Sequence, residues 1–258
     1  MTNWNAEWNA FNTIVRKEAR RFLRIWAQTL LPPAISMGLY FVIFGKLIGS
    51  RIGQMGGFSY MQFVVPGLIM MAVLTNAYSN VVSSFFGAKF QRHIEELLVS
   101  PVSNHNILLG FVVGGVMRGL CVGAIVTALS LFFTHLHIHN AWITIAILLM
   151  TSLLFSLGGF INAVYANNFD DISIVPTFVL TPLTYLGGVF YSVELLSGFW
   201  EGLSRFNPIL YIVNAFRYGM LGVSDVDVRF AFAMVGAFTV AAYAFSMYLL
   251  NSGRRLRQ

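Results

Sequence analysis

The chain has 258 residues, of which 57% are hydrophobic and only 10% are charged, and its mean hydropathy is +0.72. A soluble domain carries about 25% charged residues, so this composition excludes an ordinary soluble protein and favours one that lies in a bilayer. The 16 Lys and Arg exceed the 10 Asp and Glu, and they lie mainly between apolar segments, which indicates membrane orientation rather than nucleic-acid binding. Cys121 is the only cysteine, which excludes an internal disulfide, a cysteine zinc cluster and a CxxC redox site.

Residues 1–24 have the pattern of an amphipathic helix on the membrane surface. One side of its helical wheel is apolar and comprises Trp4, Trp8, Phe11, Val15, Ala19, Phe22 and Trp26. The opposite side carries five cations, Arg16, Lys17, Arg20, Arg21 and Arg24. We expect a membrane anchor whose cations contact anionic lipid headgroups, with docking of an acidic partner as an additional role.

Six apolar segments follow that are long enough to cross a bilayer as helices, which takes about 20 residues. They are residues 25–45, 61–86, 107–133, 141–165, 172–191 and 228–250. The sequence therefore predicts an all-α membrane protein with six transmembrane helices in a single domain over residues 1–258. With the N-terminus inside, ten Lys and Arg fall on the cytoplasmic side and five on the other, counting Arg229 at the start of the last segment, so we expect both termini in the cytoplasm.

The second segment carries a polar stripe in its cytoplasmic half, formed by Asn76, Asn80, Ser83 and Ser84. Such stripes most often bond neighbouring helices, and less often line a substrate path. Arg118 is the one charge well inside a segment. We expect it to reach the cytoplasmic headgroups or to pair with Asp170 or Asp171, in preference to contacting a substrate. The six segments contain no Asp or Glu, which disfavours a proton-driven carrier.

Residues 88–99 form a second amphipathic stretch, predicted as one short cytoplasmic helix that ends at Pro101. Its apolar residues recur with helical spacing, namely Phe90, Ile94, Leu97 and Leu98, and its charged or ionisable residues lie largely elsewhere, namely Lys89, Arg92, His93, Glu95 and Glu96. Two interpretations are equally supported. Either it is a solvated surface helix stabilised by ion pairs, or it is a compact binding site for a cytoplasmic motor subunit.

The glycines indicate packing rather than nucleotide binding. Those of the third segment recur mainly at four-residue spacing, which allows close helix approach, and they are Gly110, Gly114, Gly115, Gly119 and Gly123. A phosphate-binding loop needs G-x-x-x-x-G-K-[ST], but at Gly45-Lys46 the first glycine is replaced by Tyr40 and the hydroxyl residue by Leu47. We expect no cofactor on this chain, so a pump built on it would need an ATPase in another chain.

The loops hold the remaining candidates. Asp170 and Asp171 directly precede the fifth segment and are expected to cap it, with contact to a cytoplasmic partner as the weaker alternative. Three alternating histidines, His135, His137 and His139, could bind zinc, but a solvated external loop is favoured because no carboxylate is near in sequence. Within residues 192–227, the short apolar stretches 195–203 and 208–223 are expected to be half-inserted, re-entrant helices.

Four stretches carry a family resemblance over nearly the whole chain. They are FSYMQFVVPG at 58–67, AKFQRHIEELL at 88–98, DDISIVPTFVLTPLTYLGGVFY at 170–191, and FNP at 206–208 followed by FRYG at 216–219. In these stretches the chain resembles integral-membrane permeases of the ABC-2 type. The resemblance implies a permease with an N-terminal interfacial helix, six spans and extracytoplasmic re-entrant helices.

The same resemblance implies a bacterial inner-membrane exporter made of two permeases, each bound to an ATP-binding subunit that holds ATP and Mg²⁺. The stretch after the second span would be the coupling helix, and the first and fifth spans would form the dimer contact. The coupling residues would be Lys89, Phe90, Arg92, His93, Ile94, Glu95, Glu96 and Leu97. The alternatives are a passive channel or secondary carrier without an ATPase and, more weakly, a membrane-embedded scaffold or enzyme, although no catalytic cluster lies within the spans. No residue pattern specifies the substrate.

Overall fold

The structure is a computed structural model that describes residues 4–253. The first three residues of the predicted interfacial helix, and the cations Arg254, Arg255 and Arg257 that contribute to the orientation count, lie outside the described residues. The N-terminal part comprises α1 (Trp4–Arg24), α2 (Trp26–Thr29), α3 (Leu31–Tyr40), a π-helix (Phe41–Ile48), α4 (Gly49–Ile52), and the strands β1 (Gln54–Met55) and β2 (Phe58–Ser59). The two strands pair antiparallel as a small hairpin.

The long helices follow the hairpin. They are α5 (Tyr60–Phe90), α7 (Asn104–Ser130), α8 (Ala141–Tyr165) and α13 (Val228–Ser252), and the short α6 (His93–Val99) connects α5 to α7. Between α8 and α13 the chain forms α9 (Asp171–Val175), a π-helix (Pro176–Leu180), α10 (Thr181–Tyr185), a 3₁₀ turn (Val193–Leu195), α11 (Phe199–Arg205) and α12 (Pro208–Leu221). The chain is therefore almost entirely helical, as the sequence predicts.

Five helical segments of the described chain are long and apolar enough to cross a membrane. They are Trp26–Ile52, Tyr60–Phe90, Asn104–Ser130, Ala141–Tyr165 and Val228–Ser252, which correspond to five of the six predicted spans. The predicted span 141–165 has the same bounds as α8.

The fifth predicted span, residues 172–191, is helical only through α9, the π-helix and α10. This run covers residues 171–185 and is about 22 Å long, less than the roughly 30 Å of the hydrocarbon core. Pro176 and Pro182 lack the backbone N–H that a regular helix requires, and the chain turns after α10 at Gly188, whose φ is +67°. A full span over this segment is therefore not confirmed.

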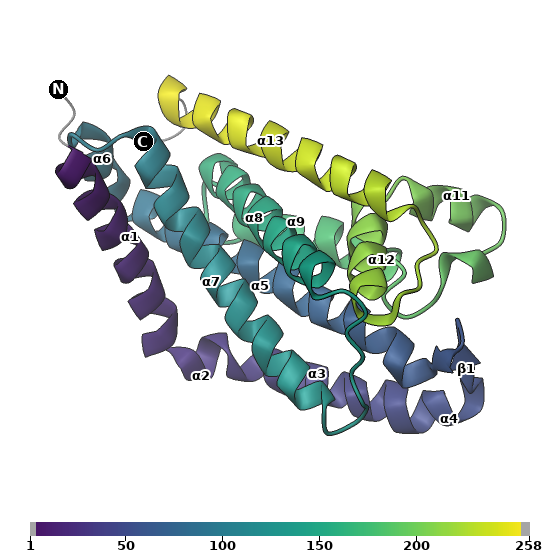
Figure 1. Cartoon of the computed structure of the whole chain (residues 1–258). Coiled ribbons are helices and arrows are strands. Elements are labelled where there is room, and N and C mark those ends of the chain that lie inside the picture. The colour runs from purple at the N-terminus through teal and green to yellow at the C-terminus, as the bar shows by residue number, and fades with distance from the viewer. Residues whose placement is uncertain (1–3, 254–258) are drawn as a thin grey trace.

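The central helix of the bundle is α5, with α7, α8 and α12 packed around it (Figure 1). Two glycines let the neighbouring helices approach closely. A Cβ atom on Gly159 of α8 would lie 2.5 Å from the Tyr78 carbonyl oxygen, and one on Gly119 of α7 would lie 3.2 Å from the Val73 carbonyl oxygen. Close helix approach, which the sequence predicts for the glycines of the third segment, is thereby confirmed at Gly119.

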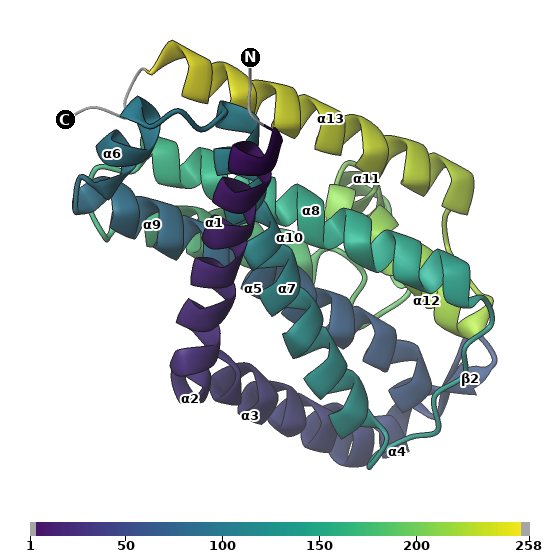
Figure 2. The same cartoon turned by 60° about the vertical axis from the view of Figure 1, so that its left-hand side comes forward.

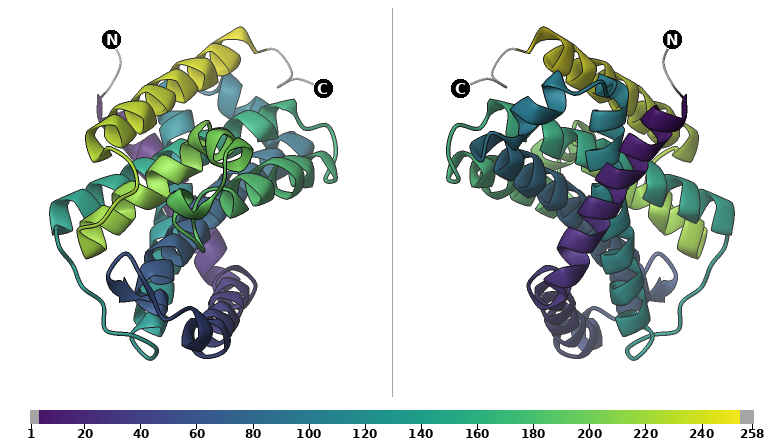
Figure 3. Two further views of the ribbon diagram at one scale, coloured as in Figure 1. Left: turned by 90° about the vertical axis from the view of Figure 1, so that its right-hand side faces the viewer. Right: turned by 90° about the vertical axis from the view of Figure 1, so that its left-hand side faces the viewer.

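The two ends of the bundle differ in character. The beginning of α1, α6 and the last turns of α13 lie at one end, which we call the α6 end (Figures 1 and 2). The hairpin of β1 and β2, together with α4, lies at the other, which we call the hairpin end (Figure 3). Helix α1 runs beside α7.

Candidate functional site

The turn into α6 corrects one sequence prediction. A single helix over residues 88–99 is wrong, because α5 continues to Phe90 and α6 begins only at His93. Between them Arg92 adopts φ +60°, and it is the only non-glycine residue of the described chain in the left-handed region. This conformation interrupts the helical path and turns α6 away from the axis of α5.

Helix α6 exposes most of its charged side chains and buries one apolar residue. Ile94 is fully buried against the core, whereas Arg92, His93 and Glu96 are exposed and Glu95 is partly so. Leu97 and Leu98 pack at the edge of the core. The helix is thus fixed by an apolar contact, and its polar side chains remain accessible at the α6 end.

Lys89 does not belong to this surface. It lies in the last turn of α5, is buried, and donates hydrogen bonds to the carbonyl oxygens of Val164 (2.7 Å) and Ala166 (2.8 Å). These carbonyls are at the C-terminal end of α8, where helical carbonyl groups lack intrahelical partners and favour a cation. The ammonium group therefore holds α5 and α8 together.

An aromatic cluster lies beside α6. The rings of Phe86 and Phe90 in α5 contact Phe169 of the α8–α9 turn, with centroid distances of 5.0 Å and 5.1 Å. In that turn Asp171 accepts a hydrogen bond from the Asn167 amide (2.8 Å), and the Asp171 amide donates to the Asn168 side chain (2.8 Å). Asp170 is exposed and forms no side-chain cap of α9 in the described structure, so Asn168 takes the capping position that the sequence assigns to the aspartates.

A buried carboxylate connects α1 to α5, and the sequence analysis missed it. Glu18 is fully buried although it lies on the helix predicted to be interfacial. Ser84 Oγ donates to Glu18 Oε1 (2.7 Å), and Arg21 Nη2 donates to Glu18 Oε2 (3.2 Å). Glu18 packs against α7 at Gly114, where a Cβ atom would lie 2.6 Å from the Glu18 Cβ. Helix α1 is therefore bonded into the bundle.

The polar stripe of α5 completes this network. Arg21 also donates to the Asn80 side chain (2.8 Å), and Arg118 of α7 donates to the Asn76 side chain (3.1 Å) and to the Thr29 carbonyl oxygen (3.3 Å). Asn76, Asn80 and Ser84 thus bond neighbouring helices, which is the interpretation of the stripe that the sequence favours.

Ser83 is the exception in the stripe, because it is exposed and, among residues 4–253, bonds only within its own helix, to the Asn80 carbonyl oxygen (3.1 Å). Arg118 does not pair with Asp170 or Asp171 in the described structure. Helices α1 and α3 pack on α7, and α2 between them places the Thr29 carbonyl beside the Arg118 guanidinium instead.

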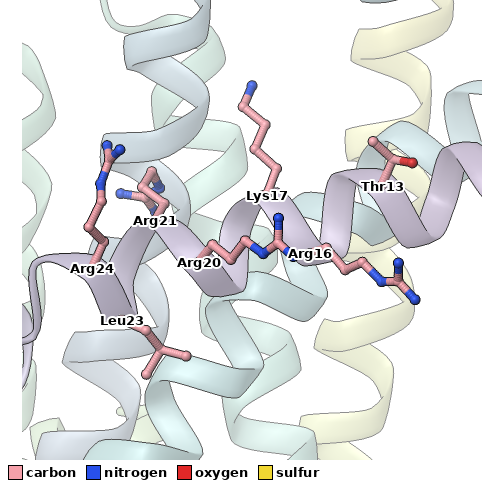
Figure 4. A pocket seen from close by; sticks show the side chains of 7 residues that line it. All are labelled: Thr13, Arg16, Lys17, Arg20, Arg21, Leu23 and Arg24. Atoms are coloured by element: carbon pink, nitrogen blue, oxygen red, sulfur yellow. The ribbon is translucent and has the colours of Figure 1, made fainter.

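The predicted apolar face of α1 is only partly buried. Phe22 of this face is buried, whereas Trp4 and Trp8 are exposed, and the burial extends instead to Ile14 and Glu18, which are not part of the predicted face. The cations gather around a hollow of about 1030 Å³ lined by Thr13, Arg16, Lys17, Arg20, Arg21, Leu23 and Arg24. All of these residues lie on α1, so the hollow is a strongly basic surface groove rather than an enclosed site (Figure 4).

Glu7 fixes the beginning of α1 next to α6. Its carboxylate accepts hydrogen bonds from the Ser103 amide (3.2 Å) and the Ser103 hydroxyl (3.0 Å), and a further one from the Asn106 side chain. The backbone N–H of Ser103 is the main cause that lowers the pKa of Glu7 below its ordinary value, and burial opposes this shift. Because Ser103 caps α7 directly after α6, Glu7 joins α1 to the exit from α6.

A buried arginine organises the hairpin end. Arg217 of α12 is fully buried and donates to the carbonyl oxygens of Gly188 (2.6 Å) and Phe63 (3.4 Å) and to the Asn214 side chain (3.2 Å). Its guanidinium carbon lies 3.8 Å from the centre of the Phe63 ring. The sequence analysis assigned no role to this residue, although a charge within an apolar stretch is itself a signal of a bonded, buried role.

The histidine loop is exposed. His135, His137 and His139 all face solvent or lipid, and the described residues contain no group of three His, Cys, Asp or Glu that could hold a metal ion. His139 packs edge-on against Tyr218, with a centroid distance of 5.6 Å, and its amide donates to the Met220 carbonyl oxygen (3.0 Å). The backbone of this loop therefore supports α12.

Comparison with known proteins establishes the class. Residues 9–221 match the family model of the ABC-2 type transporter, so the chain belongs to this family and is a membrane permease component of an ABC transporter. The chain is 61% identical over 251 residues to the inner membrane transport permease YadH of Escherichia coli (strain K12), covering 97% of this chain and 98% of that protein, and equally similar to YadH of Shigella flexneri.

A more distant relative is nodulation protein J of Rhizobium leguminosarum bv. trifolii, which is 25% identical over 227 residues, 88% of this chain and 84% of that protein. Permeases of this family typically pair with ATP-binding subunits and are generally non-enzymatic. The resemblance seen in the four sequence stretches is thereby confirmed.

Proposed function

We propose that the chain is the transmembrane subunit of an ATP-driven exporter in the bacterial inner membrane. Two copies form the translocation path, and each binds a separate ATP-binding subunit that carries ATP and Mg²⁺. The observation that carries this proposal is the construction of α6, whose buried Ile94 fixes it between α5 and α7 while Arg92, His93 and Glu96 remain exposed. Force applied to such a short, anchored helix reaches two long helices directly.

The coupling surface comprises α6 and its surroundings. Phe90 and Phe169 are each 56% exposed beside the charged side chains of α6, so an apolar contact and ion pairs are available together. Such a combination suits a protein partner, because interface cores favour aromatic residues and their rims favour polar ones. Glu7 joins α1 to the same region, so a partner seated on α6 also adjoins α1.

The proposed orientation places the α6 end in the cytoplasm, and with it both termini. The five cations of the α1 groove support this orientation, because segments next to spans carry more Lys and Arg on the cytoplasmic side. On the other side, α11 and α12 form the re-entrant part. Helix α12 is about 21 Å long, too short to span, and Arg217 bonds the backbone of its neighbours as burial in protein requires.

The proposed homodimer contact uses the first span and the helical run over residues 171–185, which lies in the fifth predicted span. Both carry exposed apolar side chains, among them Ile35, Leu39 and Leu47 on the first and Ile174 and Phe178 on the second. The first span is also the least buried of the five candidate spans, with 12% of its apolar window inside the chain. Export is the direction that we propose from the family resemblance.

The test reverses charges on α6. In nanodiscs that contain the permease and its ATP-binding subunit, Glu95→Lys/Glu96→Lys should lower ATP hydrolysis coupled to the permease, because it inverts the charge that the partner meets. The matched control, Glu194→Lys/Glu201→Lys, changes the same charge near the hairpin end and should leave hydrolysis unchanged. Equal rates of ATP hydrolysis in both variants would contradict the assignment of α6 as the coupling element. Gradient-driven flux through the permease alone would favour a passive channel or secondary carrier instead.

A further inference from the structure

An apolar cavity lies inside the bundle, apart from the basic groove of α1. Its volume is about 490 Å³, within the range of about 300–1,000 Å³ that sites for small ligands occupy. Helices α5, α8, α10, α12 and α13 all contribute to its walls, and most of the lining is apolar, including Leu154, Leu183, Ile209 and Phe238. A cavity of this chemistry excludes water and accepts apolar molecules.

The cavity follows one face of α8 over the length of one bilayer leaflet. Its lining on α8 includes Leu154, Gly158, Asn162 and Tyr165, which recur at helical spacing. From Leu154 to Tyr165 the helix rises about 16 Å, roughly half of the 30 Å hydrocarbon core. Tyr165 ends α8 at the α6 end of the bundle, so the cavity extends from the middle of the membrane to that surface.

The cavity also opens to the side of the bundle. Phe238 of α13 is 51% exposed and Tyr165 of α8 is 40% exposed, and both line the cavity. Since these two side chains line the cavity and are also exposed on the outside of the bundle, a lipid chain can enter the cavity from the side without crossing the protein. The opening and the length together favour an occupant that comes from the membrane and is elongated.

One polar group points to the chemistry of the occupant. Tyr78 of α5 lines the cavity, is only 2% exposed, and its hydroxyl has no hydrogen-bond partner among residues 4–253. Its ring lies 3.8 Å from where a Cβ atom on Gly158 would be. Its hydroxyl lies close to the Asn162 side chain but forms no hydrogen bond of good geometry with it, and the Asn162 nitrogen donates to the Ile172 carbonyl oxygen (3.3 Å). A buried hydroxyl without a partner is stabilised by an acceptor that a ligand supplies.

We propose that this cavity binds one acyl chain of a bilayer lipid, with an ester carbonyl oxygen accepting a hydrogen bond from the Tyr78 hydroxyl. Asn162 is within about 5 Å of the end of α8 along the helix axis, so the hydroxyl lies near the level at which lipid ester groups meet the hydrocarbon core. The bound chain would fill the space between α8 and the short run over residues 171–185. This binding goes beyond the proposed transport function, because it requires neither ATP nor a transported substrate.

The first test is photolabelling of the full chain in liposomes without any ATP-binding subunit. The probe is a phosphatidylethanolamine whose acyl chain carries a diazirine, and labelled peptides are located by mass spectrometry. We expect the label to concentrate on residues 154–165 and 175–183. Labelling of the lipid-exposed helix α3 to the same extent would overturn the proposal, because it would show ordinary contact with the bilayer.

Two variants distinguish labelling inside the cavity from labelling by ordinary lipid contact. Gly158→Phe places a ring in the cavity, whereas Gly38→Phe, on α3, has no atom within 4 Å of its Cβ and serves as the control. We expect about tenfold weaker labelling of residues 154–165 in the first variant and none of this loss in the second. Undiminished labelling in Gly158→Phe would contradict the assignment.

The hydroxyl is tested with Tyr78→Phe, which keeps the ring and the shape of the cavity. The chain should label roughly fivefold better with the ester probe than with the corresponding ether lipid, which lacks the carbonyl oxygen, and the variant should lose this preference. The same ester-to-ether ratio in the variant and in the unmodified chain would show that Tyr78 does not bind the lipid. All these readouts are independent of transport, so their failure leaves the coupling proposal unaffected.

Discussion

The hydrogen bonds of Glu18 predict how strongly α1 is fixed to the bundle. The variant Glu18→Gln retains the size of the side chain and an acceptor for Ser84, but it removes the charge that pairs with Arg21. Breaking a fully buried ion pair costs about 3–5 kcal/mol. Because the Arg21 side chain remains 27% exposed and keeps its bond to Asn80, we expect roughly 2 kcal/mol.

For a chain of this size about 2–4 °C of thermal midpoint corresponds to each kcal/mol, so the midpoint of Glu18→Gln in nanodiscs should fall by about 4–8 °C. The control is Glu201→Gln, which breaks the exposed pair with Arg205 (2.8 Å) and should change the midpoint little. The double variant Glu18→Gln/Arg21→Gln should lose less than the sum of the two single variants. Equal midpoints for the Glu18 and Glu201 variants would refute the view that α1 is bonded through a buried carboxylate.

Three further predictions concern other contacts. Because the pKa of Glu7 is lowered in the folded chain, its contribution to stability is present above the unfolded value of 4.5 and is lost as pH falls through the folded pKa. The difference in thermal midpoint between the unmodified chain and Glu7→Gln should therefore shrink below pH 4.5. A difference that is independent of pH would contradict this. Arg217→Lys should lower the yield of folded protein, measured by size-exclusion chromatography, because an ammonium group cannot replace the planar guanidinium that bonds three acceptors, and an unchanged yield would count against its organising role. Gly115→Ala should lower the free energy of unfolding by about 1–3 kcal/mol, seen as a lower thermal midpoint, since the added Cβ would lie 2.9 Å from the Ala77 carbonyl oxygen. Gly38→Ala meets open space and should leave the midpoint unchanged.

The spanning helices could be predicted because their signal is local. A run of apolar residues long enough to cross the bilayer specifies a helix wherever its partners lie. The bounds of α8 follow from Asn140, which caps the helix at its beginning, and from the polar Asn167–Asn168 pair beyond its end. The family could be predicted for a similar reason, because its motifs are contiguous in the sequence.

The contacts of α1 could not be predicted, because they depend on residues far apart in the chain. Glu18 meets Ser84 across 66 positions, and Glu7 meets Ser103 across 96. A helical wheel shows that Glu18 is polar, but not that a glycine face on α7 will bury it. Similarly, the break at Arg92 carries no glycine or proline as a local signal, since its conformation follows from the need to turn between α5 and α6.

The predicted fifth span was not confirmed for a different reason. Its residues are apolar enough to suggest a span, but Pro176 and Pro182 and the turn at Gly188 shorten the helix. Apolar composition alone cannot distinguish a side chain that faces lipid from one that faces a second copy or a bound acyl chain. Each of these contacts therefore needs its own experiment.

The central claim is that a separate ATP-binding subunit grips the permease at α6. The most direct measurement is native mass spectrometry of the tagged permease extracted from its own membranes, combined with crosslinking from a cysteine introduced as Glu96→Cys in a Cys121→Ser background. We expect a complex of two permeases and two ATP-binding subunits, with the crosslink joining α6 to the latter. A permease that carries no such subunit, or one crosslinked only when the cysteine is placed at Glu201, would contradict the account.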